Sequence, residues 1–299
     1  MTSVASVKDG LKNKSIATGK TMQELFTLYG LERTIYRLSI SKYKENFTLK
    51  GGIFLYALYD GNYARATTDI DFLAQRLSNE VDDIKQVFSE IFSLETDDPL
   101  RFDFDSLTVI PITEFKKYHG VNISIKAYLD KTEILISIDI GFGDVIYPER
   151  VEMDFPVVLT DENPRVYAYS LASSVAEKFE AIVSLAYDNS RFKDYYDIYV
   201  LAKERDFSGG ELYEALKETF TNRHTAMNEI VAFEDGFASE PLRQSRWRSF
   251  VKKKKPLRKV TLEETIEEIR LFLLPVVEAI RTDRSFEANW KCQDQEWKE

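Results

Sequence analysis

The sequence predicts an α/β (α+β) fold, in which a domain built on a sheet is followed by a mostly helical lobe. Three segments alternate apolar with polar side chains, as strands of one half-buried sheet do: residues 102–110, 121–128 and 133–140. From about residue 170 onward the apolar residues instead recur at helical spacing. The irregular segment 148–164 separates the two patterns. We therefore expect one domain over residues 1–160 and the helical lobe over residues 161–299.

The other elements follow from local pattern. Residues 1–20 are polar and lack a period, so we expect them to be mobile or loosely docked. Residues 22–43 predict helices interrupted near Gly30. A buried stripe and a capping sequence predict a helix over residues 80–92. In the lobe, helical spacing predicts further helices: one starting at Ser170 or Ser173, then helices near residues 211–220, 239–253 and 262–280.

Composition limits the chemistry. With 44% hydrophobic and 30% charged residues, the 299-residue chain fits a globular protein. Cys292 is the single cysteine and His119 and His224 are the two histidines, which excludes a thiolate cluster and disfavours a histidine-rich metal site. No apolar run approaches a membrane span and no signal peptide is evident, so we expect a cytoplasmic protein without a membrane partner. Any metal ion must therefore be bound through carboxylates.

The most informative stretch is residues 50–72. In a strand, residues two apart point the same way, so Asp69 and Asp71 project together. Two such carboxylates repel each other unless a cation lies between them. Magnesium suits this pair, because it binds through one or two carboxylates together with substrate phosphates. Upstream, Gly51 and Gly52 follow Lys50 and open an apolar helical segment, whose N-terminal N–H groups and dipole favour an anion. The two features together describe a site for a nucleoside triphosphate.

A third carboxylate lies on a later strand. Isoleucines occupy the even positions of residues 134–140, so Ser137 and Asp139 point to the opposite face. Asp139 would complete a metal site or take a proton from an attacking hydroxyl. Its spacing alone favours a simpler interpretation, in which it ends a strand before the glycine turn at residues 141–144.

The helical lobe has a lysine on an apolar stripe. Lys178 shares this stripe with Val175 and Ile182, and a lysine directed inward needs an anionic partner, unless it snorkels to the helix edge. Asp194 and Asp197 lie one turn apart on a half-apolar face. We expect their partner to be Lys178 or Arg191.

Charge is unevenly distributed. The net charge of −10 argues against non-specific adhesion to nucleic acid by the whole molecule. Nine basic residues nevertheless gather between positions 243 and 259, with Trp247 and Phe250 among them: Arg243, Arg246, Arg248, Lys252, Lys253, Lys254, Lys255, Arg258 and Lys259. This stretch is either a solvated linker with a helix end or an electrostatic handle for an RNA backbone.

These motifs match known families. Residues 50–72 resemble the first motif of the polymerase-beta-like nucleotidyltransferases, in which Gly-Ser or Gly-Gly opens a helix and Asp-x-Asp follows on the next strand. The form Lys-Gly-Gly followed by Arg-x-Thr-x-Asp-x-Asp resembles the AbiEii-type toxins of abortive infection, a phage defence, and of type IV toxin–antitoxin systems. Glu177-Lys178 and the Arg-x-Lys-Asp sequence at residues 191–194 resemble the later motifs of that family. Gly52 stands where many relatives have Ser, which removes one hydroxyl contact to a phosphate.

The resemblance implies a polymerase-beta-like domain with a mixed sheet, and transfer of a nucleoside monophosphate from an NTP to an acceptor hydroxyl. The implied acceptor is RNA, at a tRNA end, so that translation is blocked. The implied partner is a separately encoded antitoxin that need not touch the toxin. Mg²⁺, or Mn²⁺, would be held by Asp69, Asp71 and Asp139, and the catalytic set would add Lys178 and Asp194. The resemblance places the nucleotide contacts at eight residues: Lys50, Gly51, Gly52, Arg65, Thr68, Lys178, Arg191 and Lys193.

Two alternatives stay open. A nucleotidyltransferase that modifies a small molecule would turn over without RNA and would have an acidic acceptor pocket. A non-catalytic nucleotide-binding regulator would bind a triphosphate without turnover. The three carboxylates disfavour the regulator, because a pure binder gains nothing from a crowded anionic cluster.

Overall fold

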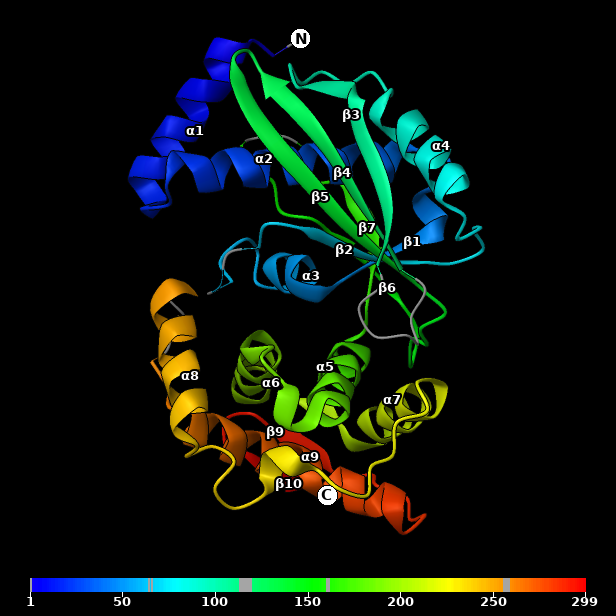
Figure 1. The fold of residues 1–299 in the computed structure, drawn as a ribbon, viewed down its shortest axis with the longest axis vertical. Helices are drawn as coiled ribbons and strands as arrows, with labels where there is room; N and C mark the ends of the chain where they lie inside the picture. The colour runs from blue at the N-terminus through cyan, green and yellow to red at the C-terminus, as the bar shows by residue number, and fades with distance from the viewer. Residues whose placement is uncertain (1, 64, 66, 113–119, 160–161, 255–258) are drawn as a thin grey trace. The chain divides into compact units, whose positions relative to one another are not determined.

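The computed structural model describes residues 2–63, 65, 67–112, 120–159, 162–254 and 259–299. The chain divides into two compact units (Figure 1). The first unit comprises Met1–Gly143 and Val151–Ala168. The second comprises Asp144–Arg150 and Tyr169–Glu299. In the described part of the chain, no helix is both long and apolar enough to cross a membrane.

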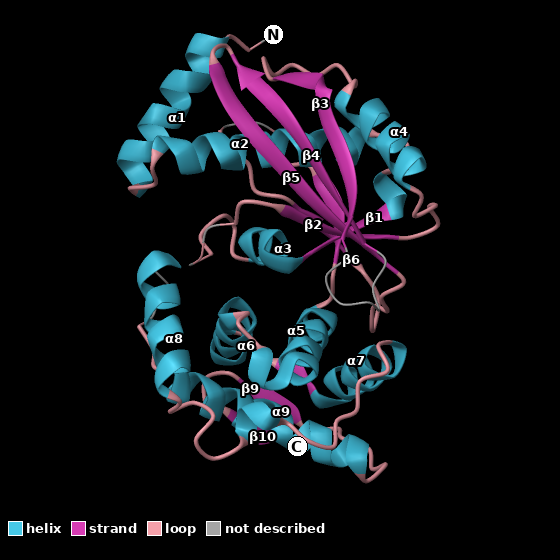
Figure 2. Cartoon of the chain, in the orientation of Figure 1, coloured by secondary structure: helices cyan, strands magenta, loops and turns pink. Residues whose placement is uncertain are grey.

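The first unit is built on a seven-stranded sheet, coloured magenta in Figure 2. Its strands are β1 (Phe47–Lys50), β2 (Ile70–Ala74), β3 (Arg101–Ile112), β4 (Gly120–Leu129), β5 (Thr132–Phe142), β6 (Val151–Asp154) and β7 (Arg165–Ala168). They lie in the order β3-β4-β5-β2-β1-β7-β6. The β2–β5 and β1–β7 pairs are parallel and the other pairs are antiparallel. The predicted α/β fold with a mixed sheet is therefore confirmed.

Helices cover this sheet. They are α1 (Val4–Thr18), α2 (Met22–Ile40), α3 (Gly51–Leu58) and α4 (Val81–Phe92), with a 3-10 turn at Lys44–Asn46. Helix α2 packs against β5, α3 against β2 and α4 against β3 (Figure 1). The predicted apolar stripe of α4 is buried: Ile84, Val87, Phe88, Ile91 and Phe92. The even-numbered isoleucines of β5 are also buried, so the predicted faces of this strand are correct.

Two predictions for the N-terminal region are wrong. Helix α2 runs without interruption through Gly30, where a Cβ would lie 2.8 Å from Cγ2 of Ile134. This glycine makes room for the helix to lie on β5, and does not break the helix. The first 20 residues form α1, which Ser3 caps and which buries Val7 and Leu11. Two buried positions in 15 residues give too weak a period to detect from sequence.

The second unit consists mainly of helices: α5 (Leu171–Leu185), α6 (Phe192–Glu204), α7 (Gly209–Asn222), α8 (Pro241–Lys254) and α9 (Leu262–Arg281). Short 3-10 turns lie at Ala186–Asp188 and Val231–Phe233. Ser170 caps α5, accepting a hydrogen bond from the backbone N–H of Ser173. The lobe is mostly helical, as expected, but strands that the sequence did not predict also follow residue 164. Strand β7 joins the sheet of the first unit, and a small second sheet contains β8 (Phe207–Ser208), β9 (Asn289–Lys291) and β10 (Glu296–Lys298). Strands of two to four residues are too short to show an alternating pattern.

Candidate active site

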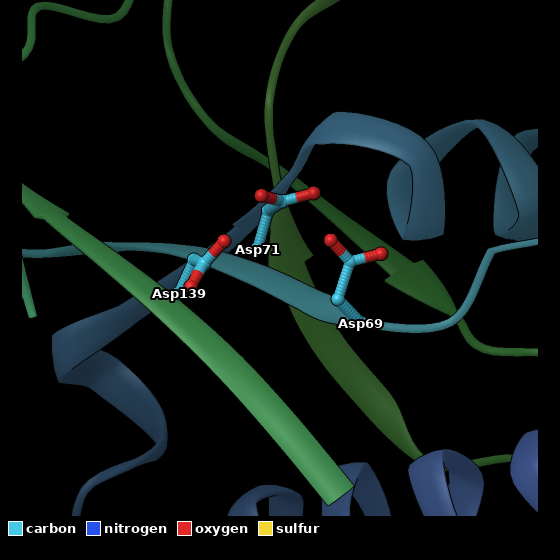
Figure 3. Close-up of side chains that lie close together, drawn as sticks. All are labelled: Asp69, Asp71 and Asp139. Carbon is cyan, nitrogen blue, oxygen red and sulfur yellow. The ribbon is translucent and has the colours of Figure 1, made fainter. Parts of the chain in front are cut away.

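Three carboxylates gather on the first unit. Figure 3 shows Asp69 and Asp71 projecting from the chain at β2, and Asp139 projecting from the neighbouring β5. One oxygen from each of the three lies within 4.8 Å of the others, and all three residues are half-buried. The parallel β2–β5 register places Asp71 opposite Asp139. The structure therefore brings together the three acids singled out in the sequence.

Strand alternation directs these acids to one face. Ile70 and Phe72 in β2 are buried, as are Ile138 and Ile140 in β5, so the intervening acids point away from the core. Asp69 comes directly before β2 and is oriented by the preceding threonines. The Thr67 hydroxyl donates to the Asp69 carbonyl oxygen at 3.1 Å, and the Thr68 N–H donates to Asp69 Oδ1 at 3.3 Å.

The cluster fits a divalent cation. Carboxylate oxygens are the hard ligands that Mg²⁺ and Mn²⁺ accept, and a cation removes the repulsion among three like charges. Because one oxygen of each acid lies within 4.8 Å of the others, a single ion can reach all three. Asp69, Asp71 and Asp139 are thus the residues that could hold the metal.

The two glycines have a role that the sequence did not reveal. Gly51 has φ +65°, and a Cβ there would lie 2.0 Å from Oδ2 of Asp71. At Gly52 a Cβ would lie 2.8 Å from Nη1 of Arg65, whose side chain is buried. The two glycines leave the start of α3 without side chains, so that the Asp71 carboxylate and the Arg65 guanidinium can approach its backbone closely. Lys50, at the end of β1, lies opposite Asp71 in the antiparallel β1–β2 pair.

We expect Gly51→Ala to impair the enzyme much more than Gly52→Ala. At Gly51 the new methyl group collides with the Asp71 carboxylate, and the left-handed backbone adds roughly 1–2 kcal/mol of strain. At Gly52 the new methyl group meets the far end of the Arg65 side chain, which must shift but can do so at less cost than the Asp71 carboxylate at 2.0 Å from the Gly51 position. Nucleotidyl transfer and thermal stability of both variants, measured side by side, test this order. Equal loss in the two variants would contradict it.

Asn122 supports the third acid and was missed from sequence. Its Nδ2 donates to Asp139 Oδ1 at 2.7 Å and to Ser137 Oγ at 3.0 Å. Asn122 lies on β4 directly opposite Asp139, in the hairpin whose turn follows Leu129. Pairing the two predicted strands 121–128 and 133–140 as a hairpin would have found it. The amide fixes the orientation of the Asp139 carboxylate.

Replacing Asn122 by alanine is expected to raise the Mg²⁺ concentration needed for half-maximal activity by about 10- to 100-fold, as loss of other outer-shell partners does. Ser124→Ala, on the same face of β4 two residues further along, is the matched control and should leave this concentration unchanged. The two readouts are Mg²⁺ titration of the transfer reaction and Mn²⁺ binding followed by electron paramagnetic resonance. Identical metal affinity in wild type and Asn122→Ala would show that the amide does not position the ligand.

The later motifs form a buried ionic cluster in the second unit. Lys178 on α5 is 8% exposed, and its Nζ lies 2.7 Å from Asp197 Oδ2 and 3.4 Å from Asp194 Oδ1 on α6. Arg191 Nε donates to Asp194 Oδ2 at 2.8 Å. Both expected partners of the acids are therefore present, and Lys178 points inward. Of the remaining predicted contacts, Lys193 is half-buried and Thr68 in the first unit is exposed.

Glu177 takes part in a second network, centred on Arg223. Arg223 Nη2 lies 2.9 Å from Asp144 Oδ1, and Nη1 lies 2.8 Å from Glu180 Oε2, while Nη2 also contacts Glu177. Burial lowers the pKa of Arg223, but the carboxylates of Glu177 and Asp144 outweigh burial and raise that pKa above its ordinary value. Arg223 thereby holds the segment Asp144–Arg150 against the helices. Its partners lie dozens of residues upstream, so no local pattern predicts it.

Comparison with known proteins identifies the family. The family model described as the nucleotidyl transferase AbiEii toxin of type IV toxin–antitoxin systems matches residues 33–270. A crystal structure from Helicobacter pylori, of a protein assigned as a nucleotidyltransferase, is similar in fold, with a TM-score of 0.53 and 16% identity. The similarity covers 89% of this chain and 100% of that one. JHP933 from Helicobacter pylori aligns at 16% identity over 88% of this chain and 95% of its own, with a TM-score of 0.49. No curated protein matches the sequence significantly. The motifs, the fold and the family match agree, and the chain belongs to the AbiEii family of nucleotidyltransferase toxins of type IV toxin–antitoxin systems.

Proposed function

We propose that this nucleotidyltransferase transfers a nucleoside monophosphate from an NTP to a hydroxyl at a tRNA end, and so blocks translation. The observation that carries the proposal is the cluster of Asp69, Asp71 and Asp139 beside the glycine start of α3. A hydroxyl oxygen of the RNA attacks the α-phosphorus and gives up its proton, for which Asp139 is the candidate base, and the bond to the pyrophosphate leaving group breaks. The family implies an antitoxin as partner. We propose that this antitoxin is separately encoded and need not contact the toxin.

In this proposal the first unit holds the triphosphate. Asp69, Asp71 and Asp139 would bind Mg²⁺ or Mn²⁺, which when bound neutralises charge on the phosphates and on the leaving group. The backbone N–H groups at the start of α3 would donate to phosphate oxygens, because they have no partner within the helix. Around this start, cationic and hydroxyl contacts would come from Lys50, Arg65 and Thr68.

The later motifs contribute further candidate residues for phosphate contacts. We assign Arg191 and Lys193 to nucleotide binding; the Arg191 side chain is half exposed and Lys193 is half-buried. We assign Lys178 and Asp194 to the same catalytic set. The ion pairs of Lys178 with Asp194 and Asp197 fix the orientation of its ammonium group and supply the anionic partner that a buried lysine requires.

The test is incubation of purified protein with Mg²⁺, total tRNA and each of the four α-labelled NTPs in turn. We expect label to enter RNA with at least one NTP. Incorporation should be abolished when EDTA is present in the reaction. Periodate-treated tRNA, whose terminal ribose diol has been oxidised, is the control for a 3′ hydroxyl acceptor and should accept no label.

Three outcomes would contradict the proposal. Label entering periodate-treated tRNA equally well would place the acceptor hydroxyl elsewhere in the RNA. Label entering a small hydroxyl compound, with none in RNA, would favour a small-molecule acceptor. Tight NTP binding with no turnover on any acceptor would favour a regulator.

A further inference from the structure

Helix α8 carries a one-sided concentration of positive charge. Its 14 residues include six lysines and arginines and no acid. Among these, Arg246, Arg248 and Lys252 are exposed, and in the described part of the chain no ion pair involves them. Lys255 and Arg258 lie outside the described residues, as do the side chains of Lys253 and Lys254. We call Arg246, Arg248 and Lys252 the basic face of α8.

The opposite side of α8 is anchored in the second unit. Trp247 is 2% exposed and packs edge-on against Phe192, with ring centroids 5.7 Å apart. Its indole N–H donates to the carbonyl oxygen of Val260 at 3.0 Å. Phe250 packs against Phe192 and Tyr196, which both lie on α6, the helix that carries Asp194 and Asp197. The helix is therefore held by its aromatic side, and the basic face is left out of this packing.

A solvated helix surface does not account for this arrangement. Exposed helices usually mix acids with bases, because oppositely charged residues four apart stabilise the helix and like charges destabilise it. Arg248 and Lys252 are like charges four residues apart, in a chain with 50 acidic and 40 basic residues. Such an arrangement is favourable when an anionic partner neutralises it.

We propose that the basic face of α8 binds the phosphate backbone of the acceptor RNA. This inference rests on the proposed function, because it takes the acceptor to be RNA. Each phosphate contact by a lysine or arginine releases condensed counterions, so three contacts give affinity that falls steeply with salt. A membrane surface fits the helix poorly. Helices that enter the bilayer interface need a broad exposed apolar side, whereas Trp247 is buried, Phe250 packs against other rings, and Leu242 is a single large apolar side chain exposed at the start of α8.

The experiment compares two triple variants in an Asp71→Asn background, so that turnover does not alter the RNA. The first is Arg246→Gln/Arg248→Gln/Lys252→Gln. The matched control, Lys12→Gln/Lys14→Gln/Lys85→Gln, makes the same change in net charge at exposed positions of α1 and α4. Fluorescence anisotropy measures the Kd for labelled tRNA between 50 and 200 mM KCl. Vesicles of phosphatidylglycerol with phosphatidylcholine provide the membrane probe.

We expect the α8 variant to bind tRNA at least about tenfold more weakly at 50 mM KCl. Its slope of log K against log [KCl] should fall in magnitude by about 2 to 3, since each contact contributes about 0.9. The control should keep wild-type values. With Asp71 intact, the α8 variant should raise KM for tRNA and leave kcat at saturating tRNA unchanged, a split that misfolding would not produce.

Several results would overturn the proposal. Unchanged tRNA affinity in the α8 variant is one, and equal loss in the two triple variants is another. A third is loss of vesicle binding in the α8 variant without loss of tRNA binding. Failure of the proposed function would give a different result. The wild-type enzyme would then transfer no label to tRNA, while tRNA binding would still depend on the basic face of α8.

Discussion

Asp71→Asn is expected to lower kcat for nucleotidyl transfer by about 10³-fold or more. The substitution removes the negative charge of one of the three carboxylates that converge within 4.8 Å, and with it a proposed anionic ligand for the divalent ion. Charge stabilisation by such an ion amounts to several kcal/mol, and each 1.36 kcal/mol is a factor of ten in rate. Asparagine keeps the size of the side chain, so the close packing against Gly51 is retained. Single-turnover transfer to tRNA is the measurement.

Asp105→Asn is the control for this variant. Asp105 is exposed on β3 of the same sheet, outside the carboxylate cluster, and its replacement makes the same change in charge. We expect it to keep wild-type activity. An Asp71→Asn enzyme within a factor of ten of wild type would rule out metal ligation by Asp71 as the basis of catalysis.

Lys178→Met is expected to destabilise the second unit by about 3–5 kcal/mol, as breaking other buried ion pairs does. Asp197 is 0% exposed, and without the ammonium group its Oδ2 loses the contact with Lys178 Nζ at 2.7 Å. Asp194 keeps its ion pair with Arg191. The three tryptophans of the chain, Trp247, Trp290 and Trp297, all lie in the second unit. Urea unfolding followed by tryptophan fluorescence therefore reports the stability of this unit selectively.

Two further variants identify the cause of this loss. Lys217→Met replaces an exposed lysine on α7 and should change stability by no more than about 0.5 kcal/mol. Lys178→Met/Asp197→Leu removes both partners and should recover much of the lost stability, because the buried charge is gone. If the double variant is as unstable as Lys178→Met alone, the lost contact between Lys178 and Asp197 is not the reason.

Short-range patterns in the sequence predicted much of the fold. The β4–β5 hairpin and α4 have repeats long enough to show which face is buried, and both faces were placed correctly. The short strands β6 to β10 and the weakly apolar α1 carry no such repeat. The continuity of α2 could not be foreseen either, because Gly30 serves a contact with Ile134 about a hundred residues later.

In the candidate site, too, neighbouring residues could be predicted from the sequence and contacts between distant segments could not. Asp69 and Asp71 were found because they are two residues apart on one strand. The role of Asp139 could not be decided from its own position. It lies beside Asp71 because β2 pairs in parallel with β5, and these two strands are far apart in the sequence. The Arg223 network joins residues from three distant segments. Contacts between such distant segments cannot be deduced from a single sequence.

The parallel pairing of β1 with β7 has a consequence for synthesis on the ribosome. Strand β1, which leads directly into Gly51, has β7 as one of its two neighbours. Residues Arg165–Ala168 follow β1 by about 115 positions, which takes roughly 6 to 24 s at the usual elongation rate of 5–20 residues per second. For that interval the nascent chain presents β1 as an open edge, the kind of surface that pairs with other chains. The sheet beneath the glycine motif is completed only after more than half of the polypeptide has been made.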